Sequence, residues 1–246
     1  MGSLLTFFSG FGLGTLLTPV FGLLFPIQIA VVCTAIVHFL NNIFKLFLVY
    51  KHIDSTIFWR FGLPSVVAAF GGAWLLKSLS MLNVEFDFEV LNGVFSTTLL
   101  NIVMGVVIIF FACFDLIPSL EHLTFDKKYM IFGGLLSGFF GGLSGNQGSL
   151  RAAFLSKTGL QKHAFVATGT AIACGIDTSR LLVYSQLIHQ NTAKIEMLPI
   201  VLATCSAFVG AYLGHKLLKK ITFNALKYFV GTCLLVFGLC LIFGVL

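Results

Sequence analysis

The stretch GGLSGNQGSLRAAFL, residues 141–155, places a group of polar and basic side chains inside an otherwise apolar run. The group consists of Ser144, Asn146, Gln147, Ser149 and Arg151. Each of these polar groups needs water or a hydrogen-bond partner, since burying it alone is costly. The stretch is also rich in glycine, which weakens helices. It therefore indicates a functional site, a broken helix, or both.

The composition of the whole chain is that of a membrane protein. A soluble domain carries about a quarter charged residues, whereas only 10% of these 246 residues are charged and 58% are hydrophobic. The 25 glycines and 28 phenylalanines are typical of a multi-pass helical protein surrounded by lipid. The net charge of +6 does not indicate nucleic-acid binding, because the basic residues fall in short loops. The six cysteines are scattered without a CxxC motif, so we expect neither a metal site nor a cofactor.

Apolar segments follow one another along the chain, each long enough to cross a bilayer core of about 30 Å. They lie at 3–24, 27–50, 57–80, 90–117, 129–158, 162–189, 195–218 and 223–246. The segments 3–24 and 129–158 differ from the others because glycines cluster in both, and the first also holds Pro19. Glycine and proline interrupt helices. These two segments are therefore predicted to be re-entrant hairpins that turn inside the membrane.

The distribution of basic residues supports two hairpins. If all segments crossed the membrane, the loops on its two sides would hold similar numbers of Lys and Arg. With two hairpins, one side holds Lys51, Arg60, Lys127, Lys128, Lys157, Lys162, Lys216, Lys219 and Lys220, and the other holds Lys77 and Lys194. That asymmetry follows the positive-inside rule. We therefore expect six full spans, two hairpins and both termini outside the cell.

The two halves of the chain resemble each other. Residues 30–51 match residues 164–185, and the Pro64 segment LPSVVAAFGGAWL matches LPIVLATCSAFVGAYL around Pro199. The predicted repeats are 1–120 and 121–246, each consisting of one hairpin and three helices. An odd number of spans places the two repeats in opposite orientations. Inverted repeats with broken helices are typical of secondary transporters.

Each predicted hairpin is followed by a helix with an Ala…Thr stretch and then by a helix led by proline. This order resembles that of the sulfite exporter TauE/SafE family. The resemblance covers nearly the whole chain, and residues 141–169 carry most of its specificity. It implies a transporter of small sulfur-containing or organic anions in the bacterial inner membrane. Many family members carry a GxGGG…P hairpin; here GFGLGTLLTP, residues 10–19, has fewer glycines, and SGNQGSLR, residues 144–151, lacks the proline and gains Arg151.

The second hairpin also predicts an anion site. A half-helix that starts near Ser149 would point its free N–H groups at the hairpin tip. Amide side chains and an arginine fork beside it suit carboxylate, sulfonate or sulfite oxygens. The predicted substrate-binding residues are Asn146, Gln147, Ser149, Arg151, Thr15, Thr18, Thr168 and Arg180. The alternative is that these groups only satisfy broken backbone and pack helices.

A second group of polar residues lies in the matched helices 27–50 and 162–189. Asp177 and Arg180 are three residues apart and share a helix face. They form either a structural salt bridge or a charge-compensating pair in which Asp177 carries a proton. His38, Asn42 and Lys45 are the corresponding candidates in the first half, although Lys45 can also extend to the membrane surface. H⁺ and Na⁺ both stay open as the coupling ion.

Taken together, the pattern predicts an all-α polytopic membrane protein that exports a small anion by alternating access, with a homodimer left open as its assembly. A passive anion channel is one alternative. The other is an intramembrane serine protease that uses Ser144, because GLSG at 142–145 and HFLNN at 38–42 match rhomboid motifs. The order of the motifs does not fit that enzyme class, so no catalysis is expected. The alternating run EFDFE, residues 85–89, is predicted to be an outer loop or a short amphipathic segment.

Overall fold

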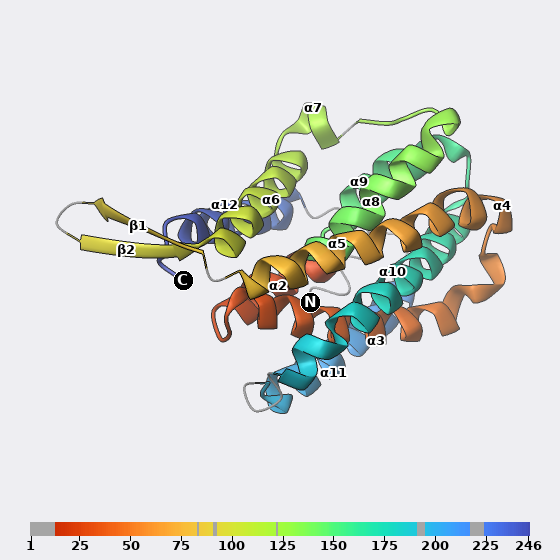
Figure 1. Ribbon diagram of the computed structural model, residues 1–246. Coiled ribbons are helices and arrows are strands. Elements are labelled where there is room, and N and C mark those ends of the chain that lie inside the picture. The colour runs from red at the N-terminus through yellow and green to blue at the C-terminus, as the bar shows by residue number, and fades with distance from the viewer. Residues whose placement is uncertain (1–12, 83, 91–92, 122, 191–194, 217–223) are drawn as a thin grey trace.

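The computed structural model describes residues 13–82, 84–90, 93–121, 123–190, 195–216 and 224–246. The described chain is mainly helical, with one two-stranded sheet at the end of the bundle (Figure 1). The longer helices are α2 (Leu13–Gly22), α3 (Ile27–Val49), α5 (Leu63–Met81), α6 (Leu99–Leu116), α8 (Met130–Ser144), α9 (Gly148–Leu155), α10 (Lys162–Gln190), α11 (Met197–Lys216) and α12 (Asn224–Ile242). Short turns are η1 (Tyr50–His52), α4 (Ser55–Ile57), η2 (Phe58–Gly62), α7 (Pro118–Glu121), η3 (Lys127–Tyr129) and η4 (Ser156–Thr158).

The glycine-rich segment 129–158 folds back on itself as predicted. Helix α8 ends where Gly145 adopts a left-handed backbone with φ of +80°, which glycine tolerates best. Helix α9 then returns toward the start of α8: the rings of Phe125 and Phe154 stack with centroids 4.3 Å apart, and a Cβ added to Gly133 would touch the Phe154 ring. The chain reversal is therefore present. In the first predicted hairpin, the arm before Leu13 lies outside the described residues.

Most glycines of α8 pack helices rather than bend them. A Cβ added to Gly134, Gly138 or Gly142 would lie 2.0–2.4 Å from a backbone oxygen of the η2–α5 segment. These glycines are four residues apart, so they form one face along α8. Small residues on such a face let two backbones approach closely, as in membrane helix pairs. The glycine cluster was predicted to mark a turn, but only Gly145 in α8–α9 provides it.

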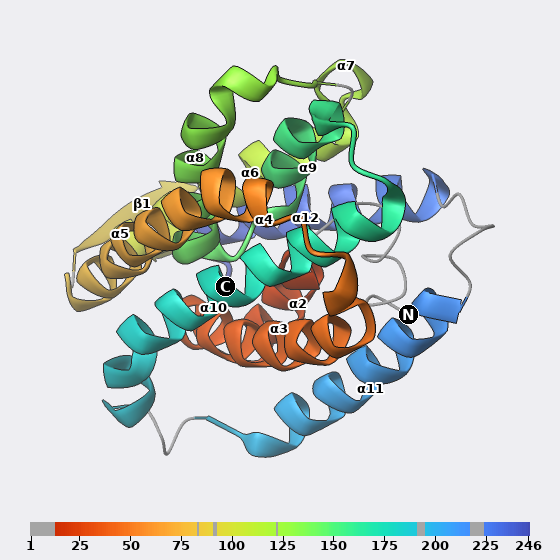
Figure 2. The same cartoon turned by 90° about the vertical axis from the view of Figure 1, so that its right-hand side faces the viewer.

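Helices α3 and α10, which belong to opposite predicted repeats, cross antiparallel at the centre of the protein (Figure 2). The rings of His52 and His163 lie 5.4 Å apart at one end of the pair. His38 and Asp177 meet near its middle, with 2.7 Å between Nδ1 and Oδ2. Helix α11 packs on α3. An inverted relation between the two halves stays a prediction.

One predicted helix is wrong at its start. Segment 90–117 was predicted to be helical throughout, but β1 (Glu85–Val90) and β2 (Gly93–Thr98) form an antiparallel pair with Glu85 opposite Thr98, and α6 begins only at Leu99. The residues 85–90 alternate between acidic and apolar side chains, which suits a strand better than a helix. The hydroxyl of Thr98 accepts from the Asn101 N–H at 3.1 Å and so caps the start of α6.

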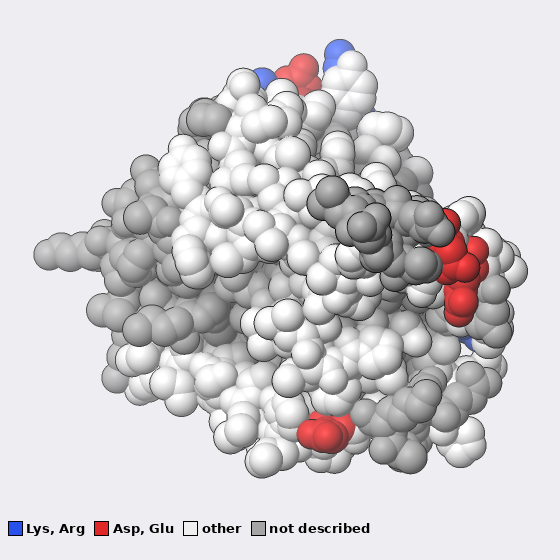
Figure 3. All heavy atoms as spheres, turned by 90° about the vertical axis from the view of Figure 1, so that its left-hand side faces the viewer, with Lys and Arg blue, Asp and Glu red and all other residues white. Residues whose placement is uncertain are grey.

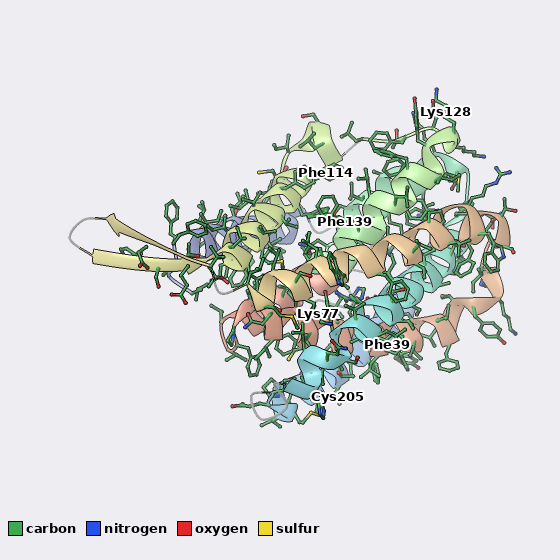
Figure 4. All side chains as sticks on the ribbon, in the orientation of Figure 1. Phe39, Lys77, Phe114, Lys128, Phe139 and Cys205 are labelled. Atoms are coloured by element: carbon green, nitrogen blue, oxygen red, sulfur yellow. The ribbon has the colours of Figure 1, made fainter. Side chains whose placement is uncertain are left out.

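The sheet and α4 lie at opposite ends of the protein (Figure 1). The chain segments at the α4 end contact their neighbours, since Asp54 N donates to Thr168 Oγ1 of α10 at 2.8 Å and Lys157 pairs with Asp126 at 3.7 Å. Lys128 lies at this outer end of α8, and Phe139 lies further along that helix toward the centre (Figure 4). The opposite end shows acidic patches and little basic surface (Figure 3). Glu85 and Asp87 of β1 thus lie at the end away from α4.

Two stretches of the described chain are long and apolar enough to cross a membrane by length and composition, Ile27–His52 and Ser55–Met81. Helix α10 has 29 residues but carries Asp177 and Arg180 in its interior. Large apolar side chains are exposed around the outside, including Phe47 at 74% and Leu198 at 68%. That surface suits contact with lipid rather than water.

Candidate functional site

The break between α8 and α9 is buried in the centre of the protein. Asn146 and Gln147 are both buried there, and Ser137 Oγ donates to the Gln147 carbonyl oxygen at 3.2 Å. A Cβ added to Gly14, at the start of α2, would lie 2.9 Å from the Gly145 carbonyl oxygen. The described arm of the first predicted hairpin therefore reaches the tip of the second.

Arg180 reaches the same break from α10. The side chain is fully buried, and a Cβ added to Gly145 would lie 2.7 Å from its Nη1 atom. Its Nη2 atom lies 2.8 Å from Asp177 Oδ1 in an ion pair. The Nε and Nη1 atoms have no hydrogen-bond partner within the described part of the chain, and neither has Gln147 Nε2. Buried donors of this kind are rare and call for an explanation.

Asp177 joins the two central helices. Its Oδ2 atom accepts from His38 Nδ1 at 2.7 Å and from Asn42 Nδ2 at 2.9 Å, both on α3, while Oδ1 faces Arg180 on its own helix. The predicted pairing of Asp177 with Arg180 is therefore present. The carboxylate also holds α3 against α10, which sequence spacing alone did not reveal.

Further basic side chains surround this carboxylate. Lys45 lies on α3 and is only 6% exposed, so it does not extend to the membrane surface. Arg151 lies one turn into α9, and its Nη1 atom donates to Gln147 Oε1 at 3.2 Å. Arg151 interacts electrostatically with both Lys45 and Asp177. Arg151 and Arg180 thus face the buried Asp177 carboxylate, and Lys45 lies beside Arg151 and His38. The excess positive charge favours an anionic ligand.

The remaining predicted site residues lie around the centre at different depths. Thr18 donates to the Gly14 carbonyl oxygen at 2.9 Å and contacts Thr34 Oγ1 at 3.4 Å, and Thr15 is buried on the same helix. Ser149 is half-buried in the first turn of α9. Thr168 differs because its hydroxyl accepts from the Asp54 backbone and anchors the loop after α3. It is nine residues from Asp177 on α10, or about 13 Å along a helix, so the structure does not bring it to the break.

Two neighbours of the break were not predicted to belong to the site. Ser137 holds the Gln147 backbone, and the Tyr184 hydroxyl donates to the Gly142 carbonyl oxygen. Both were hidden in the sequence because a hydroxyl on an apolar helix gives no signal of its partner. Their bonds satisfy backbone oxygens beside the turn, so they support the shape of the break rather than face a ligand.

These features define a class: a helical membrane protein whose centre is buried, broken and positively charged, with unpartnered donors beside the break. Within that class, the chain belongs to the sulfite exporter TauE/SafE family, whose model matches residues 1–241. The family is one of membrane transporters, which confirms the resemblance found in the sequence. Neither the curated proteins nor the solved structures gave a match to the chain.

Proposed function

We propose that this chain exports a small sulfur-containing or organic anion across the bacterial inner membrane by alternating access. The unpartnered donors at the break carry the proposal. Arg180 Nε and Nη1, and Gln147 Nε2, are buried without a partner, and both side chains adjoin the Gly145–Gln147 turn. A carboxylate, sulfonate or sulfite supplies the acceptor oxygens that such a set lacks. The N-terminus of α9 adds a helix dipole that favours negative charge.

The crossing of α3 and α10 supports a rocking movement about the site. The two helices come from opposite predicted repeats and are joined through the Asp177 carboxylate. If one repeat rocks against the other, the anion at the break is exposed first to one side and then to the other. A membrane potential that is negative inside favours the exit of net negative charge by about 2.3 kcal/mol per charge per 100 mV.

The contacts of Ser144 favour the transporter over the protease alternative. Its hydroxyl donates to the Phe140 carbonyl oxygen at 3.1 Å and lies 3.4 Å from the Asn146 backbone nitrogen. His38, the histidine of the rhomboid-like motif, pairs with Asp177 instead. A serine nucleophile needs a base within hydrogen-bond reach. Ser144 is better explained as a residue that shapes the turn.

Flux measurements on reconstituted protein test the proposal. Proteoliposomes are loaded with sulfite, methanesulfonate or acetate, and efflux is followed against concentration. We expect saturable efflux of at least one anion. Gln147→Glu places a negative charge beside the unpartnered donors, so we expect its efflux to fall at least about tenfold.

Gln161→Glu is the matched control, because Gln161 is exposed just before α10. The same substitution there should leave efflux unchanged. Efflux that rises linearly without saturation would favour the channel alternative. Full efflux in the Gln147→Glu protein would remove the break from the substrate site.

A further inference from the structure

The His38–Asp177 pair has a feature that anion binding alone does not explain. The anion site needs Arg180, but it does not need a histidine bonded to the carboxylate that neutralises that arginine. We propose that this pair binds a proton whose uptake is linked to anion binding at the break. The inference rests on the proposed function, because it assigns the coupling ion of the same site.

The contact with an ionised carboxylate favours Nε2 as the atom to which the proton adds. An ionised carboxylate only accepts hydrogen bonds, so the contact of 2.7 Å places a hydrogen on His38 Nδ1, pointing at Asp177 Oδ2. In the neutral ring, Nε2 is then the basic atom. A proton from water adds to Nε2 and converts the ring to imidazolium, while the bond to Asp177 persists. No other bond forms or breaks.

The surrounding charges link this step to the anion. The groups that face the pair are Lys45 and Asn42 from α3, Arg151 from α9, and Cys174, Arg180 and Tyr184 from α10. The cations among them already outnumber the one carboxylate, so a further positive charge on His38 is unfavourable in the empty site. An anion at Arg180 removes that penalty. By thermodynamic linkage, the proton must strengthen anion binding by the same factor.

A sodium ion fits the same place poorly. Hard cations are bound by several oxygen ligands, whereas the Asp177 oxygens already face donors of His38, Asn42 and Arg180. The nearby cations also repel a metal ion. The proton is therefore the coupling ion that this chemistry supports.

Calorimetric titration of the wild-type protein tests the inference without any variant. Sulfite and methanesulfonate are titrated into detergent-solubilised protein at one pH, in buffers that differ in ionisation enthalpy. Methanesulfonate does not titrate near neutral pH, so its binding heat reports protons taken up by the protein. We expect a heat that changes with the buffer and corresponds to an uptake of up to about one proton per anion.

Binding heat that is independent of the buffer would overturn the inference and leave the proposed function standing. If neither sulfite nor methanesulfonate binds, both the inference and the proposed function are overturned. With His38→Gln, we expect the anion to bind more weakly and without proton uptake, whereas the exposed His163→Gln control should behave as wild type. Thermal unfolding confirms that each variant is folded. Full proton uptake in folded His38→Gln protein would also overturn the inference.

Discussion

Arg180 is fully buried, although none of its three guanidinium nitrogens has a hydrogen-bond partner among the residues that the structure describes, and only Nη2 is held in an ion pair, with Asp177. Burying a charge costs several kcal/mol even after relaxation, and one ion pair seldom repays it. A purely structural arginine would be expected to use its whole fork. The arrangement is better explained if Asp177 holds one edge of the guanidinium and leaves the other edge for an anion.

Substitution of Arg180 by lysine should separate charge from geometry. Lysine keeps a positive charge near Asp177, but it lacks the planar fork that the anion would use. Because each charge-assisted hydrogen bond contributes about 1.5–3 kcal/mol, we expect anion affinity to fall roughly ten- to a hundredfold. The measurement is anion-dependent thermal stabilisation of purified protein.

The exposed Arg60→Lys variant is the matched control and should bind the anion as wild type does. Arg151→Ala, in which Gln147 Oε1 loses its donor, is expected to weaken binding as well, since Arg151 positions the amide. An Arg180→Lys protein with undiminished anion stabilisation would contradict the assignment of Arg180.

At the residue scale, the sequence predicted where the site residues lie better than it predicted which residues they contact. Asn146 and Gln147 were placed at a hairpin tip because the glycines around them indicate a turn, and both lie there. Sequence spacing also paired Asp177 with Arg180. It did not show that His38 reaches across to Asp177, since that contact spans 139 positions and depends on how two helices cross. Thr168 looked equivalent to the other threonines until its partner was known.

At the scale of the elements, α8 and α5 form the closest helix contact because both present small residues. A Cβ added to Gly138 would lie 2.0 Å from the Ser65 carbonyl oxygen, and one added to Gly72 would lie 1.9 Å from that of Phe139. Any larger side chain at these positions must push the two backbones apart. Since α8 carries the break at its end, this contact also sets the depth of the site.

The Gly138→Ala substitution should therefore destabilise the protein although alanine favours helices. We expect a loss of about 1–3 kcal/mol, typical of overpacking, measured as a lower thermal midpoint in detergent. Gly71→Ala is the control on α5, since nothing lies within 4 Å of the added Cβ there. That change should be neutral or slightly stabilising. Equal effects at both positions would mean that close packing of α8 on α5 is not the cause.

The helix bounds were predicted well where a long apolar run forms one helix. The prediction was wrong where the sequence changes from the pattern of a strand to that of a helix. Segments 27–50 and 162–189 match α3 and α10 within a few residues. The prediction for segment 90–117 failed at its start, because Val90 belongs to β1 and residues 93–98 pair with 85–90 as a strand. Strand pairing is a contact between two segments, so a single apolar run does not reveal it.

At the scale of the whole molecule, the described charged residues are distributed unevenly between the two ends. The α4 end holds the loops with Lys51, Arg60 and Lys157, whereas the far end holds the sheet with Glu85 and Asp87. A chain of this composition places basic loops in the cytoplasm. The sequence predicted this asymmetry only after two segments were interpreted as hairpins. The side on which each end lies stays a prediction.

Cysteine labelling tests the hairpin and the sidedness together. Lys128 and Lys157 flank α8 and α9, and the ion pair of Lys157 with Asp126 keeps the two flanks at one end. The native cysteines are replaced first, because Cys205 and Cys233 are exposed. Single cysteines are then introduced at Lys128, Lys157 and Glu85. We expect an impermeant thiol reagent to label Lys128→Cys and Lys157→Cys only from the cytoplasm, and Glu85→Cys only from outside. The parent without cysteines gives the background.

The outcome discriminates because the number of membrane crossings differs between the three positions. Of the described helices between Glu85 and Lys128, α6 is long enough to span and α7 has four residues, so the two positions must lie on opposite sides in any arrangement in which α6 spans. Between Lys128 and Lys157 the chain makes no crossing if α8 and α9 form a hairpin, and one crossing if they form a kinked span. Labelling of Lys128→Cys and Lys157→Cys from opposite sides would refute the re-entrant hairpin. It would also remove the reason for placing the break, and the anion site beside it, between two inverted repeats.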